Sequence, residues 1–249
     1  MNNKMLIAGC SHTAGSEIDG TQDSAYNRQH SYGNLIANNL GFVPVNISQC
    51  GSTNSAIARS VMEYIMNHDE KPNFVLVGWT DSVRVEAPYY RPSNYKTMNN
   101  AIDWYDPSGE HYLRISMFIN SIVVEEERET ILDYQSFTIR NEQYTEINNI
   151  LHILNLQSFL KLQKIPYIMV NTNYIFEKMH CTLRWYFKLI DAMRYPKFDD
   201  DTVNFYPKYK NLGYTNPLAK YGHHGADAHL DYSNYLTQYI KDYKLLENV

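Results

Sequence analysis

Short apolar runs that alternate with helix-like stretches constrain this chain more than any other feature of its sequence. The apolar runs cover residues 4–10, 42–47, 74–78 and 165–171. The third run, FVLVG, is apolar on both faces, as in the central strand of a parallel sheet. Apolar residues recur at helical spacing in residues 31–40, 54–67, 145–164 and 226–245. This alternation predicts an α/β protein in which helices cover both faces of a parallel sheet.

One segment interrupts the alternation. Residues 87–141 are rich in Tyr, Pro, Asn and charged residues, and we expect them to form an insertion over the sheet. The length of 249 residues fits one large α/β domain, so we expect a single domain spanning 1–249. A second stretch, 195–221, is rich in Tyr, Pro and Asp and is also expected to be irregular.

Composition excludes several classes of function. A net charge of −5 gives no basic face for nucleic acid. The chain has no apolar run of about 18 residues and no charged-then-apolar leader, so we expect neither a membrane span nor a signal peptide. Its three dispersed cysteines suit a reducing compartment, and we expect no cofactor. The 22 tyrosines favour interfaces or polar-ligand grooves, which makes a homo-oligomer possible.

The informative residues follow the predicted strands, because ligands of open parallel sheets bind at the carboxyl ends of the strands. Ser11 follows the first strand, after a glycine at position 9 that we expect to let the chain turn. A serine hydroxyl attacks a carbonyl only when a base takes its proton and donors hold the oxyanion. Gly51 could bring a backbone N–H close, and a histidine from the C-terminal part could be the base. The alternative for Ser11 is a turn or helix-capping role.

These residues resemble, in order, the motifs of the SGNH (GDSL-type) hydrolases, especially the short divergent members met in bacteriophage genomes. The matching segments are GCS at 9–11, the glycine at 51, GWTD at 78–81 and the histidine at 223. The resemblance runs through most of the chain and implies a flavodoxin-like three-layer α/β/α sandwich. It also implies hydrolysis of an ester, with Ser11 as nucleophile and His223 as base. The oxyanion would be held by the N–H groups of Ser11 and Gly51, together with Thr80 or Asn54.

The sequence departs from the family at two positions. Where the family has an aspartate three residues before the histidine, this chain has Lys220. Counting back from His224 or His229 does not restore the aspartate. A Ser-His dyad oriented by a backbone carbonyl is one solution, and a carboxylate from Asp227 or from residues 199–201 is another. Thr80 stands where the family has an asparagine that donates to the oxyanion.

Further residues of these motifs are expected either to support the site or to have a purely structural role. Asp81 is expected to order its loop, and His224 and His229 are expected to support the site. The three late histidines could also bind a metal ion. Adjacent histidines rarely share one ion, however, and the nearby acids are only Asp227 and Asp231, so we expect no metal site.

Three functions remain open at this stage. The leading one is a serine esterase, such as an O-deacetylase acting on a carbohydrate. The second is a non-catalytic protein that binds a ligand or glycan on the same scaffold, and the third is an acyltransferase that uses the same Ser-His pair. The expected partner is a small-molecule or glycan ester, and the expected location is a cytoplasm (the host's, if a phage encodes the protein) or a virion.

Overall fold

A parallel sheet of four strands forms the centre of the protein. The computed structural model describes residues 3–82, 84–88, 112–115, 142–173, 184–196 and 204–247. The strands lie in the order β2-β1-β3-β6, and each neighbouring pair is parallel. Their bounds are Lys4–Gly9 for β1, Val43–Asn46 for β2, Phe74–Trp79 for β3 and Tyr167–Asn171 for β6. This is the strand order of flavodoxin-like folds, which confirms the predicted fold class.

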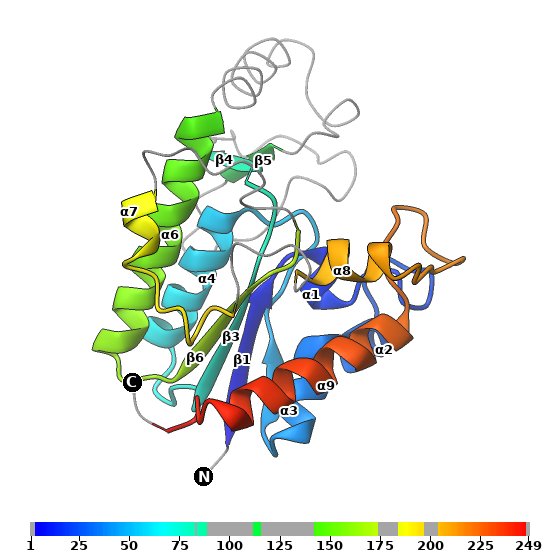
Figure 1. Cartoon of the computed structure of the whole chain (residues 1–249), viewed down its shortest axis with the longest axis horizontal. Coiled ribbons are helices and arrows are strands. Elements are labelled where there is room, and N and C mark those ends of the chain that lie inside the picture. Colours follow the sequence, from blue (N-terminus) through cyan, green and yellow to red (C-terminus); the bar gives the residue numbers. More distant parts are fainter. Residues whose placement is uncertain are drawn as a thin grey trace, which may run out of the picture.

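Helices cover both faces of this sheet (Figure 1). On one face lie α4 (Asn54–Asn67) and α6 (Glu142–Leu162), and on the other lie α3 (Tyr32–Asn39) and α9 (Ala226–Asp242). Successive strand residues point to opposite faces, so Leu6 and Val75 pack under α4 and α6, whereas Met5 and Phe74 pack under α3 and α9. The two central strands are therefore apolar on both sides, as their sequences predict.

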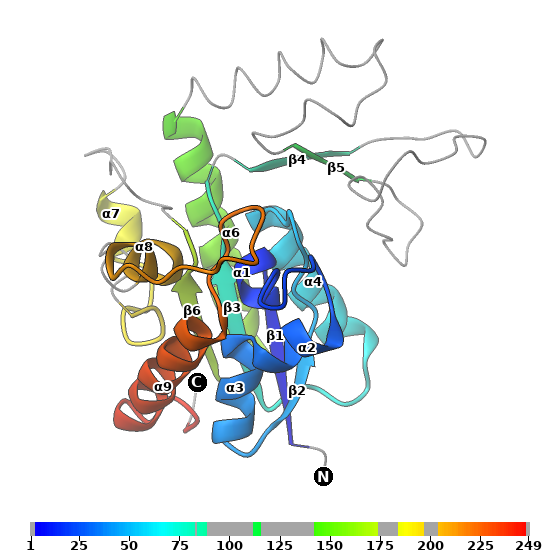
Figure 2. The same cartoon turned by 90° about the vertical axis from the view of Figure 1, so that its right-hand side faces the viewer.

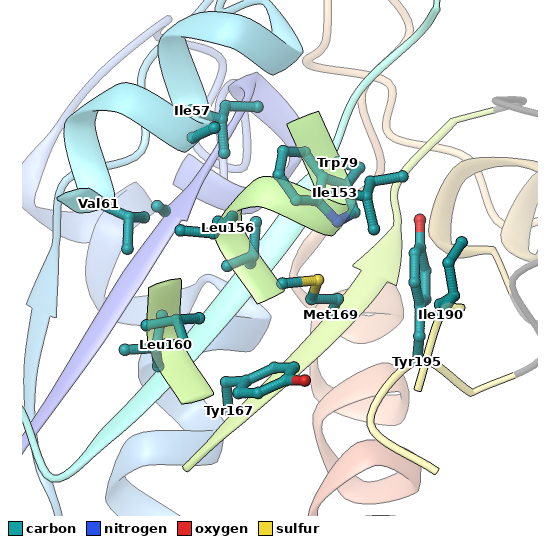
Figure 3. Packing of buried hydrophobic residues seen from close by; sticks show 14 of the residues in the cluster. Ile57, Val61, Trp79, Ile153, Leu156, Leu160, Tyr167, Met169, Ile190 and Tyr195 are labelled. Atoms are coloured by element: carbon teal, nitrogen blue, oxygen red, sulfur yellow. The ribbon is translucent and has the colours of Figure 1, made fainter. Parts of the chain in front are cut away.

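The core under α4 and α6 includes a fully buried tryptophan. Trp79, the last residue of β3, packs with Ile153 of α6 in this cluster (Figure 3). Trp79 thus belongs to the hydrophobic core and does not line a ligand site.

The observed elements refine the predicted ones at their ends. The side chain of Thr53, and not that of Asn54, caps α4 by accepting a hydrogen bond from the N–H of Ala56. Helices α1 (Ser11–Ala14), α2 (Ala25–His30) and α7 (Arg184–Phe187) were not predicted. The stretch expected to be irregular, 195–221, contains α8 (Phe205–Asn211), because buried Phe205 and Tyr209 anchor that helix against α9.

Part of the predicted insertion is described. Strands β4 (Val85–Pro88) and β5 (Tyr112–Ile115) pair as an antiparallel ribbon separate from the main sheet. The rest of 87–141 lies outside the described residues. Within the described residues, no helix is both long and apolar enough to cross a membrane.

A notch of two glycines seats α1 on the sheet. A Cβ atom on either Gly9 or Gly78 would lie 2.2 Å from Oγ1 of Thr13, in α1. The Thr13 hydroxyl shares a 2.8 Å hydrogen bond with the hydroxyl of Tyr32. Gly9 is required for this close packing and not, as the sequence indicated, for a turn, because it is the last residue of an extended strand. The notch therefore holds α1, which begins at Ser11, against the carboxyl end of β1 (Figure 2).

Candidate active site

Ser11 is the first residue of α1 and lies at the carboxyl end of β1. Its side chain is nearly buried but forms no hydrogen bond with any residue that the structure describes. The helix-capping position belongs to Cys10, whose side chain makes no capping bond. The capping role considered for Ser11 is therefore wrong, and its hydroxyl is left without a structural task.

His223 lies beside the Ser11 segment although 212 positions separate them in sequence. Its ring centroid is 4.7 Å from that of His12, the residue after Ser11. The chain that carries His223 into α9, drawn in orange in Figure 2, passes beside α1. The fold thus brings the segment that carries the predicted nucleophile beside the predicted base.

A carboxylate that the sequence analysis missed holds the other side of His223. Oε2 of Glu17 lies 2.6 Å from Nδ1 of His223, and the Glu17 side chain is only 2% exposed. The same carboxylate accepts backbone N–H bonds from Lys220 (2.9 Å to Oε1) and Tyr221 (3.0 Å to Oε2). Glu17 precedes its partners by about 200 positions, so no local spacing in the sequence pointed to it.

The backbone of Glu17 is held in an uncommon conformation. Its φ of 64° lies in the left-handed region, which few residues other than glycine adopt. Its N–H donates to the carbonyl of Thr21 (2.8 Å), and its carbonyl accepts from the side-chain amide of Asn216 (2.7 Å). These contacts hold a conformation that costs of order 1 kcal/mol.

Opposing effects set the protonation states of this pair. Burial raises the pKa of Glu17, but hydrogen bonds from His223, Tyr221 and Lys220 outweigh it, so the pKa is lowered overall. Burial lowers the pKa of His223 more than the contact with Glu17 raises it. Near pH 7 the carboxylate is therefore charged and the imidazole neutral. A neutral imidazole that donates from Nδ1 to this carboxylate carries its free lone pair on Nε2.

The other two late histidines are occupied by structural bonds. Nε2 of His224 lies 3.0 Å from the carbonyl of Tyr206. His229 is buried in α9, where its Nδ1 accepts the backbone N–H of Tyr32, and burial lowers its pKa to about 3. Both fasten the C-terminal segment to neighbouring elements, so among the three His223 is the one placed to act as base.

The ring of His12 packs beside that of His223. Its ring also lies 5.1 Å from that of Tyr206, and burial holds its pKa well below the ordinary value. Its Nδ1 is buried without a hydrogen-bond partner among the described residues.

At the end of β3, the predicted oxyanion donors are occupied or buried. Asn54 accepts the N–H of Thr80 (2.8 Å) and donates to the carbonyl of Thr80 (3.1 Å) and to Oδ1 of Asn149 (2.6 Å). Both amide hydrogens of Asn54 are thus used within the fold, and its role as an oxyanion donor stays a prediction. The hydroxyl of Thr80 is fully buried and has no partner in the described part of the chain.

Two backbone N–H groups remain as donors. Gly51 lies in the loop after β2 with a φ of 73°, and a Cβ there would meet nothing within 4 Å. Glycine is therefore needed at this position for its backbone conformation. Neither the N–H of Gly51 nor that of Ser11 donates a hydrogen bond to a described residue.

No contact of the remaining predicted acids with the His223 imidazole is found among the described residues. The Asp227 carboxylate accepts the N–H of Ala228 in the first turn of α9. The carbonyl of Asp81 accepts the N–H of Arg84, which fits its expected role in ordering the loop. Residues 199–201 lie outside the described residues. No group of three or more metal-binding side chains is found in the parts of the chain that are described.

Comparison with known proteins gives structural matches alone. No family model and no curated protein matches this sequence. The structure is similar to a carbohydrate esterase family 2 enzyme with a carbohydrate-binding domain from Corynascus thermopiles (Myceliophthora fergusii). The TM-score is 0.53 at 11% identity, over 98% of this chain and 67% of that one. At this identity the similarity shows the α/β fold and nothing more.

Two further matches have lower TM-scores. The psychrotrophic esterase EstA from Pseudoalteromonas sp. matches at a TM-score of 0.45 and 13% identity, over 97% of this chain and 98% of that one. A family two carbohydrate esterase from Clostridium thermocellum, in complex with cellohexaose, matches at 0.44 and 12%, over 96% and 63%.

Proposed function

We propose that this protein is a serine esterase in which Ser11 is the nucleophile and His223 the general base. The observation that carries the proposal is the pairing at the end of β1. A serine hydroxyl without a structural bond lies in the segment against which a neutral, largely buried imidazole packs. A neutral histidine beside a serine is the arrangement that activates a hydroxyl for attack on a carbonyl.

The reaction has two steps. Nε2 of His223 takes the proton of Ser11 as Oγ bonds to the ester carbonyl carbon, and the N–H groups of Ser11 and Gly51 hold the oxyanion. The imidazolium then gives its proton to the departing alkoxide, the ester C–O bond breaks, and an acyl-enzyme forms. Water attacks the acyl-enzyme, gives its proton to His223, and Ser11 leaves with that proton as the free acid is released.

The proposed substrate class is an O-acylated carbohydrate. The structure with the TM-score of 0.53 is a carbohydrate esterase, and fold likeness is the analogy on which this substrate class rests. The predicted homo-oligomer, and the predicted location in a cytoplasm or a virion, stay predictions.

The test is covalent labelling of the serine. Wild type and Ser11→Ala are treated with a fluorophosphonate, and intact mass is measured. We expect one adduct on wild type and none on the variant. An adduct that persists in folded Ser11→Ala would contradict the assignment of Ser11, and absence of an adduct on folded wild type would contradict an activated serine. A panel of acetylated sugars then tests the substrate class.

The state of the predicted oxyanion donors Asn54 and Thr80 supports a second candidate function, a non-catalytic binding protein on the same scaffold. Asn54 is fully occupied and Thr80 is buried, which leaves backbone N–H groups as the donors. Such a protein would bind an acylated glycan and return it unchanged, without a serine adduct. An acyltransferase would give the adduct but pass the acyl group to an alcohol other than water, which product analysis detects.

A further inference from the structure

A buried charge on Glu17 needs a physical reason. Glu17 comes six positions after Ser11, and its carboxylate is buried where His223 and the backbone of Lys220 and Tyr221 converge. Burial of a carboxylate carries a desolvation cost. Backbone N–H groups could be satisfied by a neutral carbonyl oxygen at a lower cost. The neighbour that benefits from a full negative charge is the imidazole, which becomes a cation when it takes a proton.

We propose that Glu17 is the positioning residue of this site: its carboxylate keeps the proton of His223 on Nδ1, so that Nε2 faces Ser11 as the base. The inference rests on the proposed roles of Ser11 and His223. It places the nucleophile and the positioning carboxylate on one short segment, Ser11–Glu17, whereas the base comes from the segment before α9.

The contacts of Glu17 favour this role over a purely structural one. Its shortest contact is the 2.6 Å approach to Nδ1, and the bonds to Lys220 and Tyr221 fix the direction of the same carboxylate. The backbone at Glu17 is left-handed and its side chain is buried, at a cost that a residue with no task need not bear.

The decisive variant is Glu17→Gln, which keeps the size of the side chain. Oε1 of the carboxylate accepts the N–H groups of Lys220 and Tyr221, and the N–H of Tyr221 also donates to Oε2. A Gln oxygen in place of Oε1 keeps a bond to both N–H groups, so the amide NH₂ would turn toward His223. His223 would then accept at Nδ1 and carry its proton on Nε2, where it cannot act as base. We expect fluorophosphonate labelling of Ser11 to slow by about 10²–10⁴-fold in a folded protein.

Two readouts respond to the tautomer and not to loop packing. Nitrogen-15 NMR of the imidazole is expected to show the proton on Nδ1 in wild type and on Nε2 in Glu17→Gln, with the His223 signals assigned from His223→Asn. In addition, the acid limb of the labelling rate should move to lower pH, because the Glu17 carboxylate raises the pKa of His223. The other titratable or charged groups around His223 are unchanged in this comparison: His12, His224, His229 and Arg84.

Asp19 gives a matched control from the same loop. Its carboxylate binds Thr21 and Ser24 and has no contact with His223 among the described residues. Asp19→Asn therefore disturbs the loop but should leave the tautomer and the acid limb as in wild type. Glu17→Asp keeps the charge on a shorter side chain and should recover part of the labelling rate lost in Glu17→Gln.

The outcomes separate this inference from the proposed function. Labelling of Glu17→Gln within about threefold of wild type, with an unchanged tautomer, would overturn the role of Glu17. A proton on Nε2 of His223 in wild type would overturn it without any variant, even if Glu17→Gln fails to fold. If wild type is never labelled, the esterase proposal fails, whereas a tautomer change between wild type and Glu17→Gln still establishes that Glu17 positions His223.

Discussion

The carboxyl ends of β1 and β3 are neighbours in the sheet, yet their polar residues are used in different ways. At the end of β3, Asn54 of helix α4 joins Thr80 and Asn149 in a buried set of hydrogen bonds that consumes the amide hydrogens of Asn54. After β1, the hydroxyl of Ser11 makes no hydrogen bond to a described residue, and Nε2 of His223 is equally unengaged. Similar polar residues at equivalent places in the fold thus serve stability at one strand end and are free for chemistry at the other.

The largest effect should come from Ser11, whose side chain makes no hydrogen bond to a described residue. Ser11→Ala is expected to lower ester hydrolysis by at least about 10³-fold, because no other group supplies the nucleophile. Its unfolding free energy should change by less than about 1 kcal/mol, since no hydrogen bond of the Ser11 side chain is lost. Initial rates on an activated acetate ester and urea unfolding measure the two effects. Substantial residual hydrolysis by purified Ser11→Ala would contradict the assignment of Ser11 as the nucleophile, and with it the contrast between the two strand ends.

The opposite result is expected for Asn54, whose substitution should lower stability and leave the labelling of Ser11 nearly unchanged. Asn54→Ala should destabilise the protein by about 3 kcal/mol, because it leaves buried groups of Thr80 and Asn149 without partners. The folded fraction should still react with fluorophosphonate at close to the wild-type rate.

The matched control for that variant is Asn38→Ala, an exposed position on α3, which should lie within about 0.5 kcal/mol of wild type. Urea unfolding gives the comparison. A stable Asn54→Ala protein with strongly reduced labelling would show that Asn54 donates to the oxyanion after all.

Acid should lower the unfolding free energy through buried His229, whereas the amide side chains do not titrate. His229 has a folded pKa of about 3 against an ordinary value of 6.5, so below pH 6.5 the unfolded chain binds a proton that the folded protein does not. Its contribution to the unfolding free energy therefore falls by about 2 kcal/mol between pH 6.5 and pH 5. Urea unfolding across this range should give a shallower pH dependence for His229→Gln than for wild type. Equal slopes would mean that His229 has the same pKa in the folded protein as in the unfolded chain.

The smallest effect is expected at Thr80. Its hydroxyl is buried without a partner in the described part of the chain, so Thr80→Val should change the unfolding free energy by about 1 kcal/mol or less. Labelling of Ser11 should stay within about threefold of wild type, because the hydroxyl has almost no exposed surface from which to reach an oxyanion. A loss of 10²-fold or more, the size associated with an oxyanion donor, would restore the role that the sequence predicted.

Sequence alone was sufficient for the parts of this protein that repeat a local pattern. The apolar runs and helical spacings predict the four parallel strands and the helices α3, α4, α6 and α9, because those patterns are set within a few residues. Ser11 and Gly51 could be proposed because they follow such strands, and His223 because it matches a motif of the SGNH hydrolases that the sequence resembles. Short helices such as α1 and α8 were missed, since tertiary packing by Thr13 or Phe205 holds them and local propensity does not.

The positioning carboxylate was beyond the reach of the sequence for a physical reason. The acids that the sequence offers as partners of His223 follow or precede it in the same part of the chain, whereas Glu17 reaches it across the folded structure. The roles predicted for Asn54 and Thr80 come from a motif, which names a residue type and not the bonds that its side chain has already made. Only the hydrogen-bond partners distinguish an amide that is free from one that is consumed.

Ser11–Glu17 and the segment before α9 are far apart in the sequence, so the parts of the candidate site are synthesised at different times. Ser11 and Glu17 are made before the segment that carries the imidazole, because His223 follows Glu17 by 206 positions in the chain. Tyr32 and Phe205 pack against His229, so the elements that enclose His229 also anchor the segment of His223. In the proposed mechanism, the serine therefore stays unreactive until the later segment has been made and has folded against α1.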